Sequence, residues 1–201
     1  MQDKNWTTII SPKRSLFSIN LKEIVTYRDL LFLFVKRDFI ATYKQTVLGP
    51  LWFLIQPVLT ALMFTFVFGK IAGISTEGVP KLLFYLAGTT CWNYFSECLL
   101  KTSNTFTANQ NIFGKVYFPR LITPFSIVIS SLLKFGIQFI LFIAFYLYYF
   151  FSGESIEPNQ YALLFPILVL LMGALGLGFG LIKSSMTTKY KDLKFLLSFG
   201  I

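Results

Sequence analysis

Four long apolar stretches, separated by polar segments, constrain the fold of this chain more than any other feature. An α-helix rises about 1.5 Å per residue, so roughly 20 residues cross a hydrocarbon core of about 30 Å. Charged residues make up 13% of the chain, against about 25% in soluble domains. We therefore predict an all-α integral membrane protein that forms one domain over residues 1–201. Its expected transmembrane helices are residues 51–69, 82–100, 121–151 and 161–182, and a fifth begins near residue 195.

The second and third stretches differ from ordinary spans. The second contains several polar residues, including Asn93 and the acid Glu97, so we expect it to face protein or a cavity more than lipid. The third has 31 residues and one charge, Lys134, which is long for one crossing and short for two. We interpret it as one helix that begins outside the hydrocarbon core, with Pro124 in its first turn.

Basic residues predict the orientation of the chain. The segments before the first span, between the second and third, and after the fourth hold fifteen Lys and Arg residues, whereas the other two loops hold two. Basic residues are enriched in cytoplasmic loops. The amino terminus is therefore expected in the cytoplasm, in a multi-pass arrangement.

Residues 30–44 are expected to form a helix that lies at the cytoplasmic membrane surface. The segment is apolar at first and then carries Lys36, Arg37, Asp38 and Lys44, so it cannot span a membrane. An ordinary solvated helix is the alternative. Gly49 and Pro50 then predict a break before the first span.

Glu97 and Lys134 are the two charged residues inside the predicted spans. They could form an ion pair across two helices. Alternatively, Lys134 extends to the headgroups while Glu97 faces water. Gly176 and Gly180 form a G-x-x-x-G pair in the fourth span, which either packs another helix closely or reflects the general abundance of glycine in membrane helices.

Several kinds of chemistry are excluded. The chain has no histidine, and its aspartates are never paired, so neither His-based catalysis nor a paired-carboxylate metal site is expected. No G-x-x-x-x-G-K-[ST] motif is present, so the chain is not itself an ATPase. We predict no catalytic residue, no metal site and no cofactor in this chain, and we interpret Cys91 and Cys98 as buried free thiols.

Three motifs occur in order along the chain. YKQTVLGPLWFLIQP precedes and opens the first span (43–57), KVYFPR precedes the third (115–120), and KYKDLK precedes the fifth (189–194). With these motifs the chain resembles the permeases of type-2 ATP-binding-cassette exporters, in the branch that exports lipid-linked O-antigen, capsule or teichoic-acid polymers. The motif and hinge residues are Gly49, Pro50, Trp52, Pro57, Tyr117, Phe118, Pro119 and Arg120.

The resemblance implies a homodimer in a bacterial cytoplasmic (inner) membrane, with a separate P-loop ATPase subunit that holds ATP and magnesium. Family members contact that ATPase through the segments that match residues 30–44 and 102–120. These are also the two largest predicted cytoplasmic segments. The implied docking residues are Lys36, Arg37, Phe106, Asn111 and Lys115.

The chain departs from the family in two respects. Family members continue beyond the fifth span, so we expect this chain to be truncated at its carboxyl end. The resemblance also does not explain a base at Lys134.

Aromatic residues suggest a cargo. The chain has 24 Phe, ten Tyr and three Trp, and aromatic faces can stack on the apolar faces of sugars. We predict that some aromatic residues of the second span line a path for lipid-linked polysaccharide, although core packing would explain any one of them equally well. A permease for a drug or small lipid, and a membrane scaffold without transport activity, are the alternatives; no nucleic acid is expected. The candidates for the path are Phe84, Tyr85, Trp92, Tyr94 and Phe95.

Overall fold

The computed structural model describes residues 21–44, 48–154 and 160–187, and all regular elements in these ranges are helical. The all-α class is therefore confirmed. The KYKDLK motif and the start of the predicted fifth span lie outside the described residues. The elements are α1 (Leu21–Thr26), α2 (Arg28–Tyr43), η1 (Gly49–Leu51), α3 (Trp52–Phe64), η2 (Thr65–Ile71), α4 (Lys81–Ser103), α5 (Thr105–Ala108), α6 (Gln110–Phe113), α7 (Ile122–Phe151), η3 (Gln160–Leu164) and α8 (Phe165–Thr187).

Three helical segments in the described ranges are long and apolar enough to cross a membrane. They are Gly49–Ile71, Ile122–Phe151 and Gln160–Met186, and they coincide with the predicted first, third and fourth spans. The chain is thus a membrane protein. α4 has 23 residues, as many as α8, but its polar residues make it less apolar, so its crossing remains a prediction.

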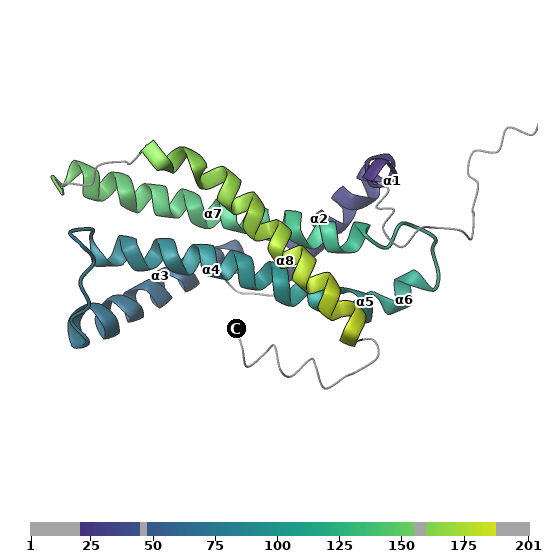
Figure 1. Ribbon diagram of the computed structural model, residues 1–201, viewed down its shortest axis with the longest axis horizontal. Coiled ribbons are helices and arrows are strands. Elements are labelled where there is room, and N and C mark those ends of the chain that lie inside the picture. The colour runs from purple at the N-terminus through teal and green to yellow at the C-terminus, as the bar shows by residue number, and fades with distance from the viewer. Residues whose placement is uncertain (1–20, 45–47, 155–159, 188–201) are drawn as a thin grey trace, which may run out of the picture.

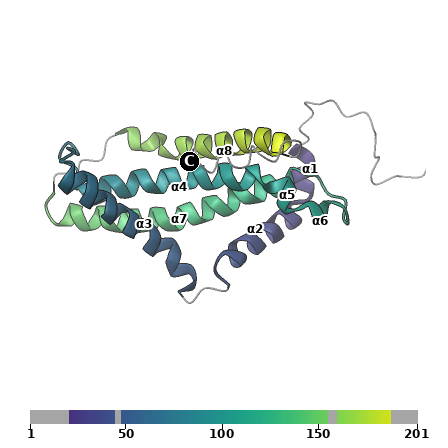
Figure 2. The ribbon, with the colours of Figure 1, turned by 90° about the horizontal axis from the view of Figure 1, so that it is seen from below.

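α4 lies at the centre of the bundle, in contact with α3, α7 and α8 (Figures 1 and 2). The polar helix α4 therefore faces protein on several sides, as its composition led us to expect. One core cluster joins Tyr94 and Cys98 of α4 to Phe135 of α7 and Val169 of α8. Cys98 is buried, Cys91 is half-buried, and both are free thiols.

Glycine residues bring α8 against α4. A Cβ atom at Gly176 would lie 2.7 Å from Cys98 Cβ, and one at Gly180 would lie 2.6 Å from Thr102 Cβ. Carbon atoms do not approach this closely, so the α8 backbone can take this position only with glycine at both sites. A Cβ at Gly178 would meet nothing within 4 Å. The structure therefore supports the first interpretation of the G-x-x-x-G pair, in which the glycines allow another helix to pack closely.

α2 packs against the start of α7. Leu31 and Phe34 form a buried cluster with Phe118 and Ile122, and the rings of Phe34 and Phe118 meet edge to face, with centroids 5.6 Å apart. α2 and α3 form the two arms of a V, which is seen most clearly in Figure 2. The chain therefore changes direction between α2 and the first span.

The π-helical turn η2 extends the first span past its predicted end at residue 69. Thr65 Oγ1 donates to the carbonyl of Ala61 at 2.7 Å, and Lys81 Nζ donates to the carbonyl of Gly69 at 2.6 Å. The second bond satisfies a carbonyl near the helix end and ties that end to α4. The helix ends at Ile71, and the following loop is correspondingly shorter.

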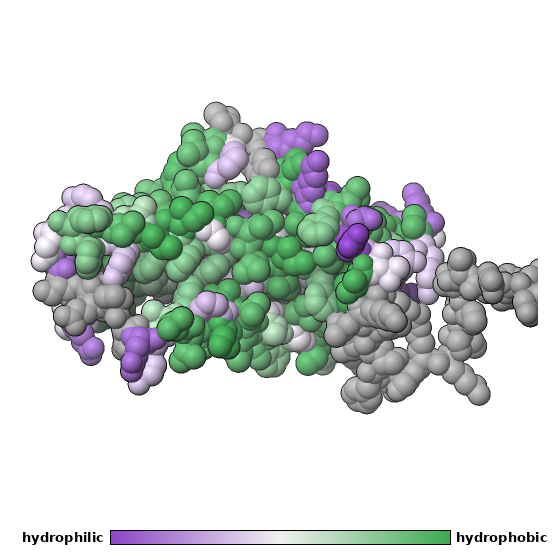
Figure 3. Space-filling view, turned by 90° about the horizontal axis from the view of Figure 1, so that it is seen from above, coloured by the Kyte–Doolittle hydropathy of each residue, from purple (hydrophilic) through white to green (hydrophobic). Residues whose placement is uncertain are grey.

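The outer surface of the bundle is hydrophobic along most of its length. Figure 3 shows a broad hydrophobic face with hydrophilic residues gathered toward the two ends of the molecule. Large apolar side chains of α8, including Leu168 and Leu170, are exposed. A surface of this kind matches a hydrocarbon surrounding better than water.

Candidate functional site

Glu97 of α4 binds two ammonium groups. Lys134 Nζ of α7 donates to Glu97 Oε1 at 2.6 Å, and Lys101 Nζ, one turn along α4, donates to the same oxygen. The Lys134 side chain is 6% exposed, and its Nζ lies 5.4 Å from the ring centroid of Phe53 in α3, where cation–π attraction adds to the ion pair. Glu97 and Lys134 therefore form an ion pair across two helices, which is the first of the two alternatives.

Two buried serine residues lie on the same face of α7 as Lys134. Ser126, Ser130 and Lys134 are four positions apart, so they share one helical face, and all three are buried. Ser130 Oγ donates to the carbonyl of Ser126 at 2.7 Å, and Ser126 Oγ donates to the carbonyl of Thr123 at 2.8 Å. Small side chains that bond to their own helix allow neighbouring helices to approach.

A cavity of about 500 Å³ opens beside the cluster, where α2, α4, α5 and α7 meet. We call it the polar cavity because seven of its eleven lining residues have polar side chains, although apolar atoms form most of its surface. Lys101 lines it from α4, and Arg37 and Asp38 line it from α2. Arg37 pairs with Asp38 at 2.8 Å, and Arg37 Nη2 lies 3.5 Å from Asn109 Oδ1, at the residue that follows α5. The cavity thus lies between the two segments, residues 30–44 and 102–120, that the resemblance implies for ATPase docking.

The five implied docking residues lie at this end of the molecule. Lys36, Arg37, Asn111 and Lys115 are exposed. Phe106 is half-buried, with its ring centroid 6.0 Å from that of Phe113. Four of the five side chains are therefore accessible to a partner, and Phe106 takes part in packing the short helices.

The motif residues divide into structural and exposed ones. Gly49 has φ +51°, a conformation that favours glycine, and Pro50 follows within η1. Pro57 lies inside α3 and is buried, while Trp52 is exposed. Because Pro57 removes one backbone hydrogen bond from the helix, we expect a kink near residues 53–56.

The KVYFPR segment likewise has one buried anchor. Phe118 is 6% exposed and joins the cluster with α2, and Pro119 is half-buried. Tyr117 and Arg120 are exposed. This segment therefore sets the start of α7, where Pro124 stands in the first turn as predicted, and it leaves polar groups on the surface.

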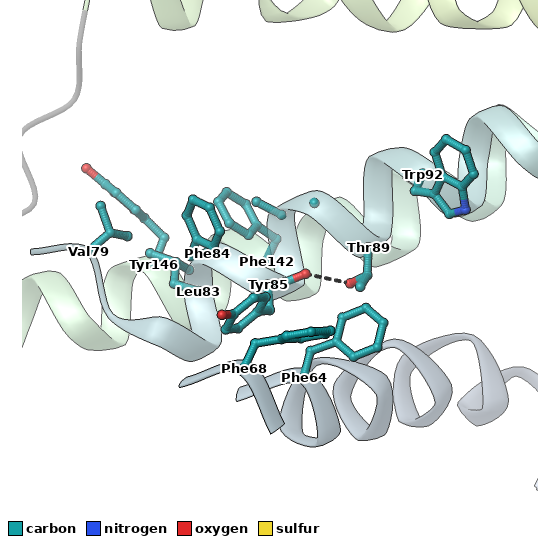
Figure 4. Close-up of a pocket in the computed structure, with 12 residues that line it drawn as sticks. Phe64, Phe68, Val79, Leu83, Phe84, Tyr85, Thr89, Trp92, Phe142 and Tyr146 are labelled. Atoms are coloured by element: carbon teal, nitrogen blue, oxygen red, sulfur yellow. Dashed lines mark hydrogen bonds between the residues drawn. The ribbon is translucent and has the colours of Figure 1, made fainter. Parts of the chain in front are cut away.

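An aromatic cavity of about 670 Å³ lies between α3, α4 and α7, toward the other end of the bundle (Figure 4). Phe84, Tyr85 and Trp92 line it from α4, and Phe64 and Phe68 line it from the first span. The rings of Phe64 and Tyr85 meet edge to face, with centroids 6.3 Å apart. The cavity thus brings together three of the five aromatic residues that were predicted to line a path.

Tyr94 and Phe95 lie outside this cavity. Tyr94 is 3% exposed and packs on Phe135, with ring centroids 5.1 Å apart. Its hydroxyl oxygen occupies the space that a Cβ at Gly173 would need, at 2.5 Å. Phe95 is half-buried, and its ring centroid lies 6.0 Å from that of Trp92.

Lys101 and Phe53 are the residues of the charged cluster that the sequence did not single out. Lys101 follows Glu97 by four positions, the helical spacing at which Glu and Lys attract each other, so this signal was available. Phe53 contacts Lys134 across two helices, and no sequence pattern indicates such a contact. The same holds for Asn109, which accepts a hydrogen bond from Arg37 at the turn between α5 and α6.

Within the described ranges, no group of three or more His, Cys, Asp or Glu residues could hold a metal ion. A bundle of long apolar helices, with a charged cluster and an aromatic cavity between them, is the architecture of a multi-pass membrane protein. The family model of ABC-2 type transporters matches residues 29–201. The chain belongs to this family, and its part is that of a membrane permease without catalytic chemistry of its own.

Three relatives carry the same name, "O-antigen export system permease protein RfbA". The one from Myxococcus xanthus is 26% identical over 89% of this chain and 66% of its own length. Two from Klebsiella pneumoniae are 29% and 25% identical, over 86% and 92% of this chain and 64% and 69% of their own lengths. The chain thus spans about two thirds of the length of the curated relatives that it matches.

Proposed function

We propose that this chain is the transmembrane permease subunit of an ATP-driven exporter that moves lipid-linked polysaccharide out across a bacterial cytoplasmic membrane. The cargo would be of the O-antigen, capsule or teichoic-acid type. The observation that carries the proposal is similarity to three O-antigen export permeases over 86 to 92% of the chain. The order of the three sequence motifs supports the same branch of the family.

The α2 end of the bundle would face the cytoplasm and bind a P-loop ATPase. Arg37 and Asn109 lie within 3.5 Å of each other, so α2 is joined to the turn that follows α5. The exposed residues Lys36 and Lys115 add positive charge there. ATP and magnesium would be held by that partner. Motion of the partner would act on α2 and α5, and two copies of the permease would enclose the path.

The aromatic cavity supports a path for a large, variable cargo. Exposed aromatic faces such as those of Phe84 and Trp92 can stack on sugar rings or on hydrocarbon without demanding one sequence of sugars. The lining is almost entirely apolar, and its Thr89 hydroxyl is already bonded to the carbonyl of Tyr85 at 2.8 Å. That observation favours the second candidate function, export of a drug or small lipid, which needs fewer hydrogen bonds.

Co-purification tests the docking part of the proposal. The chain would be expressed with a P-loop ATPase encoded beside it, and the ATPase recovered with the tagged permease would be measured. We expect Lys36→Glu combined with Lys115→Glu to reduce recovery at least tenfold. Deleting residues 30–44 is a poorer test, because it would also remove Leu31 and Phe34 from the core.

Lys70→Glu is the matched control, since Lys70 is an exposed base at the opposite end of the first span. Equal recovery for the double variant and the control would contradict docking at the α2 end. Cargo is tested separately, by restoring surface polysaccharide in cells that lack their own permease gene. Restoration of drug resistance without polysaccharide would favour the second candidate.

A further inference from the structure

Two ammonium groups share one carboxylate oxygen in the charged cluster. Lys101 and Lys134 both donate to Glu97 Oε1, and one carboxylate neutralises one ammonium group. Arg37 and Asp38, which line the adjoining cavity, pair with each other at 2.8 Å. These five side chains therefore hold three positive charges and two negative ones, and their net charge is +1.

This surplus charge lies in partly buried surroundings. The side chains of Lys134 and Glu97 are 6% and 26% exposed, and that of Lys101 is 45% exposed. A buried charge without a partner is costly, because protein screens it less than water does. Lys101 also lines the polar cavity of about 500 Å³, so an anion in that cavity could reach it.

We propose that the polar cavity between α2, α4, α5 and α7 binds the phosphate group of an anionic membrane lipid. In a lipid such as phosphatidylglycerol, the phosphodiester gives the headgroup a net charge of −1, which matches the surplus of the cluster. In phosphatidylcholine, the choline group cancels that charge. Arg37 has five N–H donors, and Lys101 has three; the bonds to Asp38, Asn109 and Glu97 leave donors over on both side chains. Arginine and lysine are the side chains that most often bind phosphate.

The position of the cavity favours a lipid over a soluble anion. Leu100 and Ile127 line it together with the charged residues, and they would lie beside the first carbons of an acyl chain. α4 and α7 meet there near one end of each helix, where a lipid headgroup would lie if both cross the membrane. The inference stands on the charges and the cavity, and it does not depend on which cargo the permease exports.

Native mass spectrometry of the purified full chain in detergent tests this site. The chain would be titrated with phosphatidylglycerol, phosphatidylcholine and inorganic phosphate. We expect phosphatidylglycerol to bind at least fivefold more tightly than phosphatidylcholine, and inorganic phosphate to bind weakly. Lys134→Met removes the surplus charge and should lower phosphatidylglycerol affinity about fivefold, the usual effect of one charge on anionic-lipid binding.

Glu97→Gln provides the decisive comparison, because it breaks the same ion pair but raises the net charge to +2. It should increase phosphatidylglycerol affinity, whereas a merely structural cluster would respond to both variants in the same direction. If Glu97→Gln does not fold, Arg37→Gln tests the site from an exposed side chain, with Lys36→Gln on the same helix as control. Three results would overturn the proposal: equal affinity for phosphatidylglycerol and phosphatidylcholine, a change in the same direction for Lys134→Met and Glu97→Gln, or the same loss of affinity for Lys36→Gln as for Arg37→Gln. Strong binding of inorganic phosphate would show that the phosphate need not come from a lipid.

Discussion

Lys134 Nζ and Glu97 Oε1 lie 2.6 Å apart, although the two residues are 37 positions apart in the chain. The contact joins α7 to α4, and Phe53 of α3 lies against the same ammonium group. Three helices therefore meet at one charged cluster. Charged residues within apolar helices are tolerated where they pair, and this pairing accounts for both predicted intramembrane charges.

Reversing the charges should test the energetic value of this pair. Glu97→Lys and Lys134→Glu should each lower stability by about 2 kcal/mol or more, because each leaves like charges together in a partly buried site. The double variant restores one opposite pair and should recover part of the loss. Thermal unfolding in detergent measures all three variants. A double variant whose loss equals the sum of the two single losses would show that the pair contributes nothing.

The glycine contact between α8 and α4 predicts a sharp difference between neighbouring positions. Gly180→Ala would place a Cβ 2.6 Å from Thr102 Cβ and should cost about 1–3 kcal/mol through overpacking. Gly178→Ala would meet nothing within 4 Å and should be neutral or stabilise the helix by up to about 1 kcal/mol. Unfolding temperatures of the two variants decide the matter, and equal values would refute the close contact.

The turn before the first span depends on Gly49. Its φ of +51° costs a residue with a side chain about 1–2 kcal/mol, so Gly49→Ala should strain or move the break between α2 and α3. Gly49→Ala with Pro50→Ala would let one helix continue more easily, and we expect export to fall strongly in a complementation assay. Gly114→Ala serves as control, since nothing lies within 4 Å of its added carbon. Full export by the double variant would show that export does not depend on the break between α2 and α3.

The aromatic cavity predicts that transport and stability can be separated. Trp92 and Phe84 are 51% and 50% exposed, so Trp92→Ala with Phe84→Ala should reduce export severalfold and leave the unfolding temperature within a few degrees of the parent. Tyr94 is buried, so Tyr94→Ala should instead destabilise the protein by about 3 kcal/mol or more, as large core truncations do. Export and thermal unfolding, measured on the same preparations, check both. Unchanged export by the double variant would exclude this cavity from the path.

Hydropathy was sufficient to predict three of the long helices nearly to their ends. Apolar stretches of span length have few other stable structures in lipid, so residues 51–69 and 121–151 correspond closely to observed helices. The fourth helix continues to Thr187, five residues past its predicted end at residue 182. The last two residues of η2, Lys70 and Ile71, were missed. The hydrogen bond from Lys81 to the carbonyl of Gly69 joins this end of the helix to α4, and a contact between two helices is not visible in hydropathy.

The orientation of side chains around α4 could not be predicted in the same way. A helix in contact with three others has no single apolar face, so periodicity does not tell which residues face a cavity and which face the core. Tyr94 and Trp92 are two positions apart, yet one is buried against Phe135 and the other is exposed at the aromatic cavity. That difference depends on where α7 and α8 lie, and the sequence of α4 does not contain it.

The close contact through Gly173, Gly176 and Gly180 has a mechanical consequence. Tyr94, Cys98 and Thr102 occupy the space that side chains at those positions would fill, so α8 cannot slide along α4 without first separating from it. We expect the two helices to move as one rigid body. We then expect relative motion in the first span, where 11% of the residues in its most apolar 18-residue stretch are buried. A lateral opening toward the lipid would form along α3 rather than along α8.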